Sequence, residues 1–198
     1  MNTLPPPRQY HHGNLRAALL DAAERSLRAR GVAQLSLRDL ARDVGVSHAA
    51  PRRHFVERQD LLDALAEAGY ARLGAQIHNA TAEETADFAT LVHAAASAFV
   101  HFASENAALL EVMNAAKHGT QSSEVPRASE VAYAPILRLI HRGQAEGALR
   151  PGKPEEIGLI LYATMNGIAT LVNTSAVHAS RLDRLTRIAV EQFLRGAS

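Results

Sequence analysis

Apolar side chains recur along most of this chain at intervals of three and four residues, the spacing of one face of an α-helix. Between residues 14 and 30 they form a single face, and Gly31 follows as a stop signal. Short helices are predicted next over about 36–44 and 47–55, and a longer one over about 57–79. No segment alternates as a strand would, so this part of the chain is predicted to be helical throughout.

The remainder of the chain keeps the same period. Further helices are predicted over residues 84–105, 106–117, 129–146, 155–173 and about 182–193, with loops over 118–128 and 147–156. Pro135 should kink its helix or mark the true start of that helix. The helix over 155–173 is apolar almost all round, which a solvated surface helix would not be. About nine helices in 198 residues predict an all-α fold.

Composition narrows the class of protein. The chain has no Cys, is 47% hydrophobic and has no apolar run of about 18 residues, so disulfides, zinc–thiolate sites and membrane spans are not expected. The N-terminus lacks a signal-peptide pattern, and residues 1–12 read as a Pro-rich flexible tail. Neither a Gly-x-Ser-x-Gly elbow nor a Gly-rich phosphate loop is present. We therefore expect a cytoplasmic protein that is not an enzyme, with no cofactor and no membrane partner.

The charges are unevenly distributed. Residues 1–60 carry ten Arg and six acidic residues, whereas residues 61–198 carry eleven cations and fourteen acidic residues. A basic first third on an acidic remainder is typical of a nucleic-acid-facing module joined to a second module.

The most informative stretch is SLRDLARDVGVSHAAPRRHF, residues 36–55. Ala41 is small where a following helix would cross, and Gly45, four residues later, supplies the left-handed turn that other residues adopt at a cost. Ser36 and Ser47 can cap the two short helices. The pattern predicts a helix-turn-helix whose second helix lies in the major groove of DNA.

Side chains near this turn are suited to DNA. Short residues after the turn let the backbone approach the bases, while Arg and His side chains reach phosphates or guanine edges. Phe55 is expected to anchor the module in its own core. The predicted DNA-binding residues are Ser36, Arg38, Ser47, His48, Ala49, Ala50, Arg52, Arg53, His54 and Arg58. The alternative is a packing unit of short helices that binds no DNA.

Residues 10–70 resemble the N-terminal domain of the tetracycline-repressor (TetR) family of bacterial regulators. The resemblance is carried by YHHGNLRAALLDAAERSLRARG, then SLRDLARDVGVSHAAPRRHF, then VERQDLLDAL. Arg52 stands where the family usually has a backbone-contacting Tyr, and Arg58 replaces a Lys, so phosphate contacts are implied at both. The segment YATMNGIA at 162–169 is similar to a Trp-x-x-x-His-Gly signature of one subclass, with Tyr162 and Asn166 replacing Trp and His.

The resemblance implies a homodimer that binds a pseudo-palindromic operator in double-stranded DNA. Residues 13–73 would bind DNA, and residues 74–198 would dimerise and hold a small-molecule effector. The most direct expectation is a repressor that a small apolar ligand releases from DNA. The apolar helix over 155–173 and the last helix would pair with their copies as a four-helix interface.

Scattered large side chains in the second part are candidates for an effector pocket. The predicted ligand-binding residues are Phe88, Phe99, Phe102, Met113, Tyr133 and Met165. No acidic or basic cluster is expected to point inward there. The alternative function is a helical small-molecule-binding protein without operator-specific DNA binding. Arg52, Arg53 and Arg58 argue against it.

A stripe of His93, Ser97 and His101 has a spacing that zinc ligands use. At about 100° per residue, however, this stripe lies opposite the apolar face of its helix. We therefore expect a solvated or subunit-facing edge there and no metal site.

Overall fold

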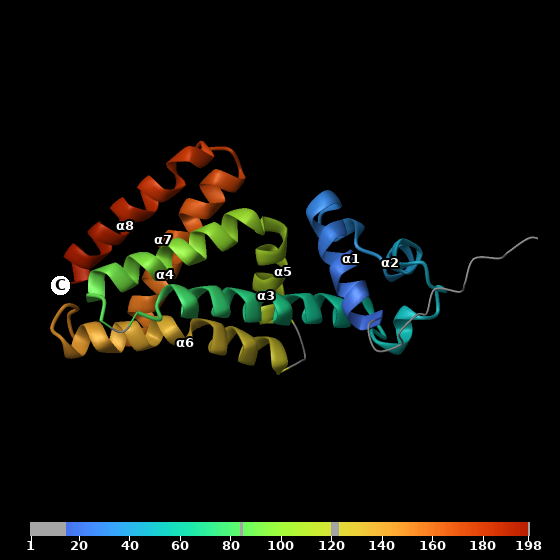
Figure 1. Cartoon of the computed structure of the whole chain (residues 1–198), viewed down its shortest axis with the longest axis horizontal. Helices are drawn as coiled ribbons and strands as arrows, with labels where there is room; N and C mark the ends of the chain where they lie inside the picture. The colour runs from blue at the N-terminus through green and yellow to red at the C-terminus, as the bar shows by residue number, and fades with distance from the viewer. Residues whose placement is uncertain (1–14, 84, 120–122, 198) are drawn as a thin grey trace, which may run out of the picture. The chain divides into compact units, whose positions relative to one another are not determined.

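The computed structural model describes residues 15–83, 85–119 and 123–197, and all regular elements among them are helical (Figure 1). The α-helices are α1 (Leu15–Arg30), α2 (Leu37–Val44), α3 (Arg58–Ala80), α4 (Phe88–Glu105), α5 (Ala107–Gly119), α6 (Glu124–Ala145), α7 (Pro154–Asn173) and α8 (Leu182–Ala197). Short 3₁₀ turns occupy Val32–Gln34, Pro51–Arg53 and Ala179–Arg181. The all-α prediction is confirmed. The predicted tail over 1–12, and residues 120–122 of a predicted loop, lie outside the described residues.

Contacts divide the chain into two units, which meet between Leu62 and Asp63. The unit boundary lies within α3, and so does the boundary after residue 73 that the sequence suggests. In the first unit, α1 packs against α2 and against the 3₁₀ turn at Pro51–Arg53. The core of this unit consists of Leu19, Ala22, Ala23, Leu27, Leu35, Leu40, Ala41, Phe55 and Leu61.

The second unit is built around α4, which packs against α6, α7 and α8 (Figure 1). The apolar face predicted for α4 is confirmed, because each of its members is at most 7% exposed: Phe88, Leu91, Val92, Ala95, Phe99 and Phe102.

Glycines let α3 run close to its neighbours. A Cβ on Gly69 would lie 2.6 Å from Met113 Sδ, and one on Gly74 would lie 2.9 Å from Ala132 Cα.

The start of α4 differs from the prediction because of a cap. Asp87 precedes the helix, and its carboxylate accepts hydrogen bonds from the Thr90 backbone N–H at 3.0 Å and the Thr90 hydroxyl at 2.6 Å. These two bonds hold the pKa of Asp87 below its usual range. The helix therefore begins at Phe88 rather than at residue 84.

The start of α6 also differs from the prediction. The loop predicted over 118–128 was too long, because α5 continues to Gly119 and α6 begins at Glu124. Pro126 falls in the first turn of α6, where its missing N–H breaks no hydrogen bond. Pro135 lies inside the helix and is buried, so it does not mark the start.

The last two helices leave apolar surface uncovered in the single chain. On α7, Leu159 is 63% exposed, Ile160 61% and Leu171 46%. On α8 the buried stripe is Leu182, Thr186 and Val190. Leu182, Leu185, Ala189 and Phe193 share one face of α8, of which Leu182 is buried and the other three are half-buried. No helix in the described part of the chain is long and apolar enough to cross a membrane.

Candidate nucleic-acid interface and cavity

The turn predicted at Gly45 is present. Gly45 has φ 77° and ψ 34°, the left-handed conformation that glycine adopts without steric cost. The Val46 N–H donates to the Ala41 carbonyl at 2.9 Å and the Gly45 N–H to the Arg42 carbonyl at 3.1 Å. These two bonds satisfy carbonyls that the end of α2 would otherwise leave open. Ala41 is fully buried, as its predicted place beneath a crossing segment requires.

The capping predicted for Ser36 does not form. Ser36 occupies the N-cap position with extended backbone, but its side chain makes no capping hydrogen bond. Asp39, three residues after Ser36, pairs with Arg42 at 2.9 Å. The first-turn amides of α2 therefore have no side-chain cap from Ser36, and such amides readily bind an anion.

The segment after the turn was predicted to be an α-helix over 47–55, and that prediction was wrong. The chain forms a turn followed by a 3₁₀ helix at Pro51–Arg53. Pro51 has no N–H to give the Ser47 carbonyl, which accepts the Ala50 N–H at 3.0 Å instead. The tighter pattern continues, because the Arg53 N–H donates to the Ala50 carbonyl at 3.2 Å.

Phe55 anchors this segment in the first unit, as predicted. Its side chain is 1% exposed. The Arg16 guanidinium carbon lies 5.5 Å from the centre of the Phe55 ring, within the range of a cation–π contact. The backbone that carries the predicted DNA-binding side chains is therefore tied to α1.

Most of the predicted DNA-binding side chains are exposed. Arg38, Ser47, His48, Ala49, Arg52, Arg53, His54 and Arg58 are exposed, whereas Ser36 and Ala50 are half-buried. Arg38, Arg52 and Arg53 have no ion pair among the described residues.

Other arginines of the first unit are neutralised. Arg28 lies 2.7 Å from Glu24, Arg42 lies 2.9 Å from Asp39, and Arg30 lies 3.8 Å from Asp43. Arg38, Arg52 and Arg53 therefore place positive charge that is unpaired among the described residues at the start of α2 and in the segment after the Gly45 turn.

Arg58 has a structural role that the sequence did not reveal. Its Nε donates to the Leu35 carbonyl at 3.0 Å, and its Nη2 donates to the Val32 carbonyl. The first residue of α3 thereby holds the connection that precedes α2. The bonding partners are backbone atoms more than twenty residues away, so no local sequence signal could have indicated them.

The second unit contains a cavity of about 500 Å³, lined by residues from α3, α4, α5, α6 and α7. Of the predicted ligand-binding residues, Phe99, Tyr133 and Met165 line it.

The other three predicted residues pack in the core. Phe88 fills the space above Gly143, where a Cβ would lie 2.5 Å from the ring, and Phe102 lies under the Arg72 guanidinium at 5.5 Å. Met113 packs against Gly69.

Polar residues that sequence reasoning missed also line the cavity: Tyr70, Asn114, Ser129, Glu130, Glu155 and Tyr162. The Tyr70 hydroxyl donates to the Met113 carbonyl at 3.1 Å, and the Tyr162 hydroxyl donates to Asn114 Oδ1 at 3.1 Å. The two glutamates of this lining are exposed.

The cavity tyrosines have raised pKa values. Burial is the main cause for Tyr70, Tyr133 and Tyr162, because a phenolate loses hydration in an apolar site. For Tyr133, which is raised furthest, the neighbouring Tyr162 and Tyr70 add to this effect. All three side chains are therefore neutral phenols at physiological pH.

The histidine stripe on α4 makes a contact with the last helix. His101 Nε2 lies 2.8 Å from Asp183 Oδ1 on α8. His93 and Ser97 are half-buried. In the described part of the chain, no three His, Asp or Glu side chains are grouped so that they could hold a metal ion.

Comparison with known proteins bears on both units. A family model described as bacterial regulatory proteins of the tetR family matches residues 19–65. A solved protein of unknown function from Rhodococcus sp. is 41% identical, with a TM-score of 0.87 over 96% of this chain and 98% of that chain. No match was found among curated protein sequences.

Two regulators share the fold at low identity. The TetR family transcriptional regulator PfmR from Thermus thermophilus is 19% identical, with a TM-score of 0.71 over 92% of this chain and 96% of that chain. A TetR family transcription regulator from Marinobacter aquaeolei is 15% identical, with a TM-score of 0.75 over 92% of this chain and 94% of that chain.

The residues that the family model matches include the Gly45 turn, the buried Phe55 anchor and the exposed arginines between them. The chain belongs to the tetR family of bacterial regulatory proteins, DNA-binding transcription regulators with an N-terminal helix-turn-helix.

Proposed function

We propose that this chain is a dimeric repressor that binds a pseudo-palindromic operator and leaves it when a small molecule occupies the cavity. The observation that carries the DNA-binding part is the placement of Arg38, Arg52 and Arg53. These side chains are exposed and without an ion pair among the described residues, whereas Arg28, Arg30 and Arg42 are paired. Exposed, uncompensated cations on a helix-turn-helix suit the phosphate backbone of DNA.

The proposed contacts fall into two classes. Ser36, Arg38, Arg52 and the first-turn amides of α2 would bind phosphates and set the register, while His48 and Arg53 would read base edges. Ser47, Ala49, Ala50 and His54 complete the DNA-facing set. Arg58 would support this surface mainly through its bonds to the Leu35 and Val32 carbonyls.

Binding of a selected operator duplex, followed by fluorescence anisotropy, tests the assignment. Arg52→Ala should weaken binding to all duplexes and flatten the salt dependence by about 0.9 in log–log slope for each phosphate that the variant no longer binds. Arg53→Ala should instead relax preference at one or two base positions, by about 1–3 kcal/mol each. Arg138→Ala, which removes an equally exposed cation from α6, is the matched control and should change neither.

Two outcomes would contradict the proposal. One is equal, weak binding to every duplex at about 0.15 M salt, since specific complexes bind far more tightly than non-specific ones. The other is an Arg138→Ala effect as large as that of Arg52→Ala. The first would favour a helical ligand-binding protein without operator specificity.

The dimer proposal rests on α7 and α8. Leu159, Ile160 and Leu171 on α7 are exposed, and a Cβ on Gly167 would meet nothing within 4 Å. Two copies of these helices would bury this surface as a four-helix interface, and Gly167 would allow close approach. A two-fold dimer would hold its DNA-binding segments about one helical turn, 34–36 Å, apart.

The effector proposal rests on the cavity in the second unit. Its volume of about 500 Å³ lies within the range of about 300–1,000 Å³ typical of small-molecule sites. Phe99, Tyr133 and Met165 are the proposed contacts for the apolar part of the ligand. Phe88, Phe102 and Met113 would shape the wall from behind.

A further inference from the structure

We propose that the cavity is built for an organic cation, an apolar body carrying one protonated amine, with the amine held at the rim between Glu130 and Glu155. This inference rests on the proposed effector function and names its ligand class. It is carried by the charges, the hydrogen bonds and the depth of the residues that line the cavity.

The charged lining is entirely acidic among the described residues. Glu130 on α6 and Glu155 on α7 both line the cavity, and no Lys, Arg or His does so. Neither carboxylate forms an ion pair with another described residue. Two carboxylates without an ion pair in the lining of one cavity attract a cationic ligand and repel an anionic one.

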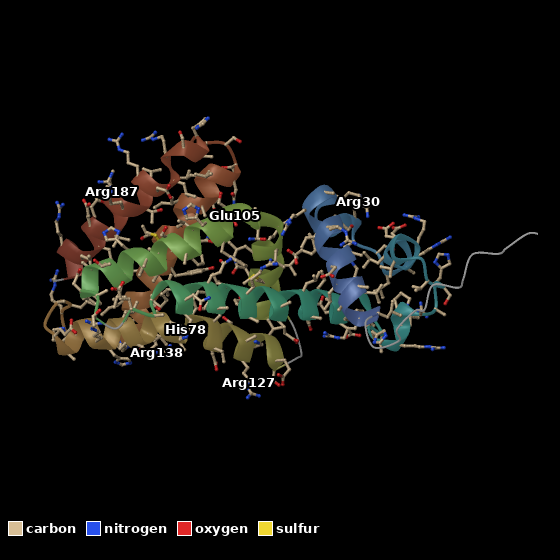
Figure 2. The ribbon with its side chains drawn as sticks, viewed as in Figure 1. Arg30, His78, Glu105, Arg127, Arg138 and Arg187 are labelled. Atoms are coloured by element: carbon tan, nitrogen blue, oxygen red, sulfur yellow. The ribbon has the colours of Figure 1, made fainter. Side chains whose placement is uncertain are left out.

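The arginines of α6 do not offset this charge. Arg127 and Arg138 flank Glu130 in sequence, but both are exposed and neither lines the cavity. Figure 2 shows them projecting from α6 away from α3 and α4. The only charged residue that α6 contributes to the described lining is therefore Glu130.

The tyrosine hydroxyls of the lining are engaged with neighbouring protein groups. The proton of Tyr70 is donated to the Met113 carbonyl and that of Tyr162 to Asn114 Oδ1. A phenol that has donated its single proton offers its oxygen lone pairs to other groups. The Tyr70 oxygen, however, interacts with the Ser129 side chain and the Tyr162 oxygen with the Tyr133 side chain. The two carboxylates are therefore the acceptors that an ammonium at the rim complements.

Four aromatic rings of the lining pack against one another. The Phe99 and Tyr162 ring centres are 5.4 Å apart, those of Tyr133 and Tyr162 5.7 Å, and those of Tyr70 and Tyr133 6.3 Å, all nearly edge-to-face. Clusters of aromatic rings bind organic cations through the negative potential of ring faces. This interaction distinguishes an amine from an alcohol of the same shape.

The apolar and acidic residues of the cavity lining differ in burial, which suits a ligand with one apolar and one charged end. Ile77, Ala95, Ala96 and Met165 are buried and apolar, whereas Glu130 and Glu155 are exposed. An apolar chain gains by filling the interior, while an ammonium at the rim keeps part of its hydration and avoids the cost of full burial. The site therefore favours an amphipathic monocation over a compact polycation.

Three probes that share one apolar body test the inference: decylamine and decanoate below their micellar concentrations, and decanol below its solubility limit. Tyrosine fluorescence is a suitable signal because the full chain has four Tyr and no Trp, and three of these Tyr line the cavity. Calorimetry on the same samples gives independent affinities. Decylamine should bind about tenfold more tightly than decanol, and decanoate more weakly than both.

Paired variants locate the preference. Glu130→Gln combined with Glu155→Gln keeps the side-chain shape and should remove the tenfold advantage of decylamine while leaving decanol affinity unchanged. Glu105→Gln makes the same charge change at an exposed position that does not line the cavity, and it should alter nothing (Figure 2). Binding of decanoate as tight as decylamine, failure of decylamine to bind, or an unchanged preference in the double variant would overturn the inference.

These measurements use protein without DNA, so they test the ligand class separately from the proposed release of the operator. If decylamine binds preferentially but operator affinity stays the same, the ligand class stands and ligand-induced release fails. If instead decanoate binds best and releases the operator, release stands and the cationic ligand class is wrong.

Discussion

Arg58 illustrates how one side chain can support a binding surface without touching the ligand. Its guanidinium spans two backbone carbonyls, of Leu35 and Val32, and a charged donor to a carbonyl is worth more than a neutral one. Arg58→Ala should therefore lower the free energy of unfolding by about 1–3 kcal/mol in urea denaturation. Arg25→Ala removes another exposed arginine of the first unit and should stay within about 0.5 kcal/mol.

Arg58→Lys separates the two roles of this residue. Lysine keeps the charge but lacks the planar fork that reaches both carbonyls. The variant should keep the salt dependence of DNA binding while remaining less stable than the parent protein. If Arg58→Ala is as stable as the parent and only its DNA affinity falls, the phosphate role is the whole of its function.

The buried tyrosines predict how stability changes with pH. Their folded-state pKa values are raised above the unfolded value of about 10, so the folded protein holds its phenolic protons more tightly. Their contribution to stability is complete below about pH 10 and is lost as the pH rises through and beyond that value. Urea denaturation at about pH 9 and about pH 11 should show this loss. Tyr133→Phe should lose less stability across the same interval, and an identical loss would contradict the prediction.

Residues whose role is local were predictable, and residues whose role depends on distant partners were not. Gly45 and Phe55 were predicted because a left-handed turn and a buried anchor follow from short-range sequence pattern. The pairing of Tyr162 with Asn114 joins α7 to α5 across 48 positions, and no periodicity indicates it. Pro51 was a local signal that was passed over: its missing N–H makes the segment 3₁₀ rather than α.

At the scale of elements, the exposed apolar side chains of α7 lead us to expect that one charged substitution there will dissociate the proposed dimer. Ile160→Asp would place two like charges at a two-fold interface and would leave them poorly hydrated. The dimer dissociation constant should rise at least about tenfold, which is about 1.4 kcal/mol, in sedimentation velocity. Val131→Asp on α6 is the matched control, because Val131 is 68% exposed and lies outside α7 and α8. A stable Ile160→Asp dimer, or a Val131→Asp monomer, would rule out this interface.

Element type was predicted more securely than element boundaries. The period of three and four residues gave the helices, including the long apolar α7. The boundaries of α4 and α6 depended on particular residues: Asp87, which caps α4, and Pro126, which a first turn tolerates. The apolar residues of α8 share one face, but the single chain buries Leu182 and leaves Leu185, Ala189 and Phe193 half-buried.

At the scale of the whole molecule, α3 is the element that both units share. It begins at Arg58 in the first unit, and its later turns carry Tyr70 and Ile77 of the cavity. A ligand weakens DNA binding only if it prefers the conformation that binds DNA poorly. Under the proposed function, α3 would transmit this preference, since displacement of its cavity-lining turns moves one continuous helix.

The proposed coupling between ligand binding and operator binding must be reciprocal, whatever conformational change carries it. If a cavity ligand lowers operator affinity by a given factor, the operator must lower ligand affinity by the same factor, and a factor of about 5–150 is typical. Anisotropy of labelled operator at saturating ligand, and calorimetry of the ligand at saturating operator, should therefore return equal factors.

Ala95→Trp fills the cavity from α4, where Ala95 is 1% exposed. This variant should therefore lose ligand binding and the ligand response together while remaining dimeric. A ligand that saturates the second unit without changing operator affinity would refute the switch, and a response that survives in Ala95→Trp would place the effector outside this cavity.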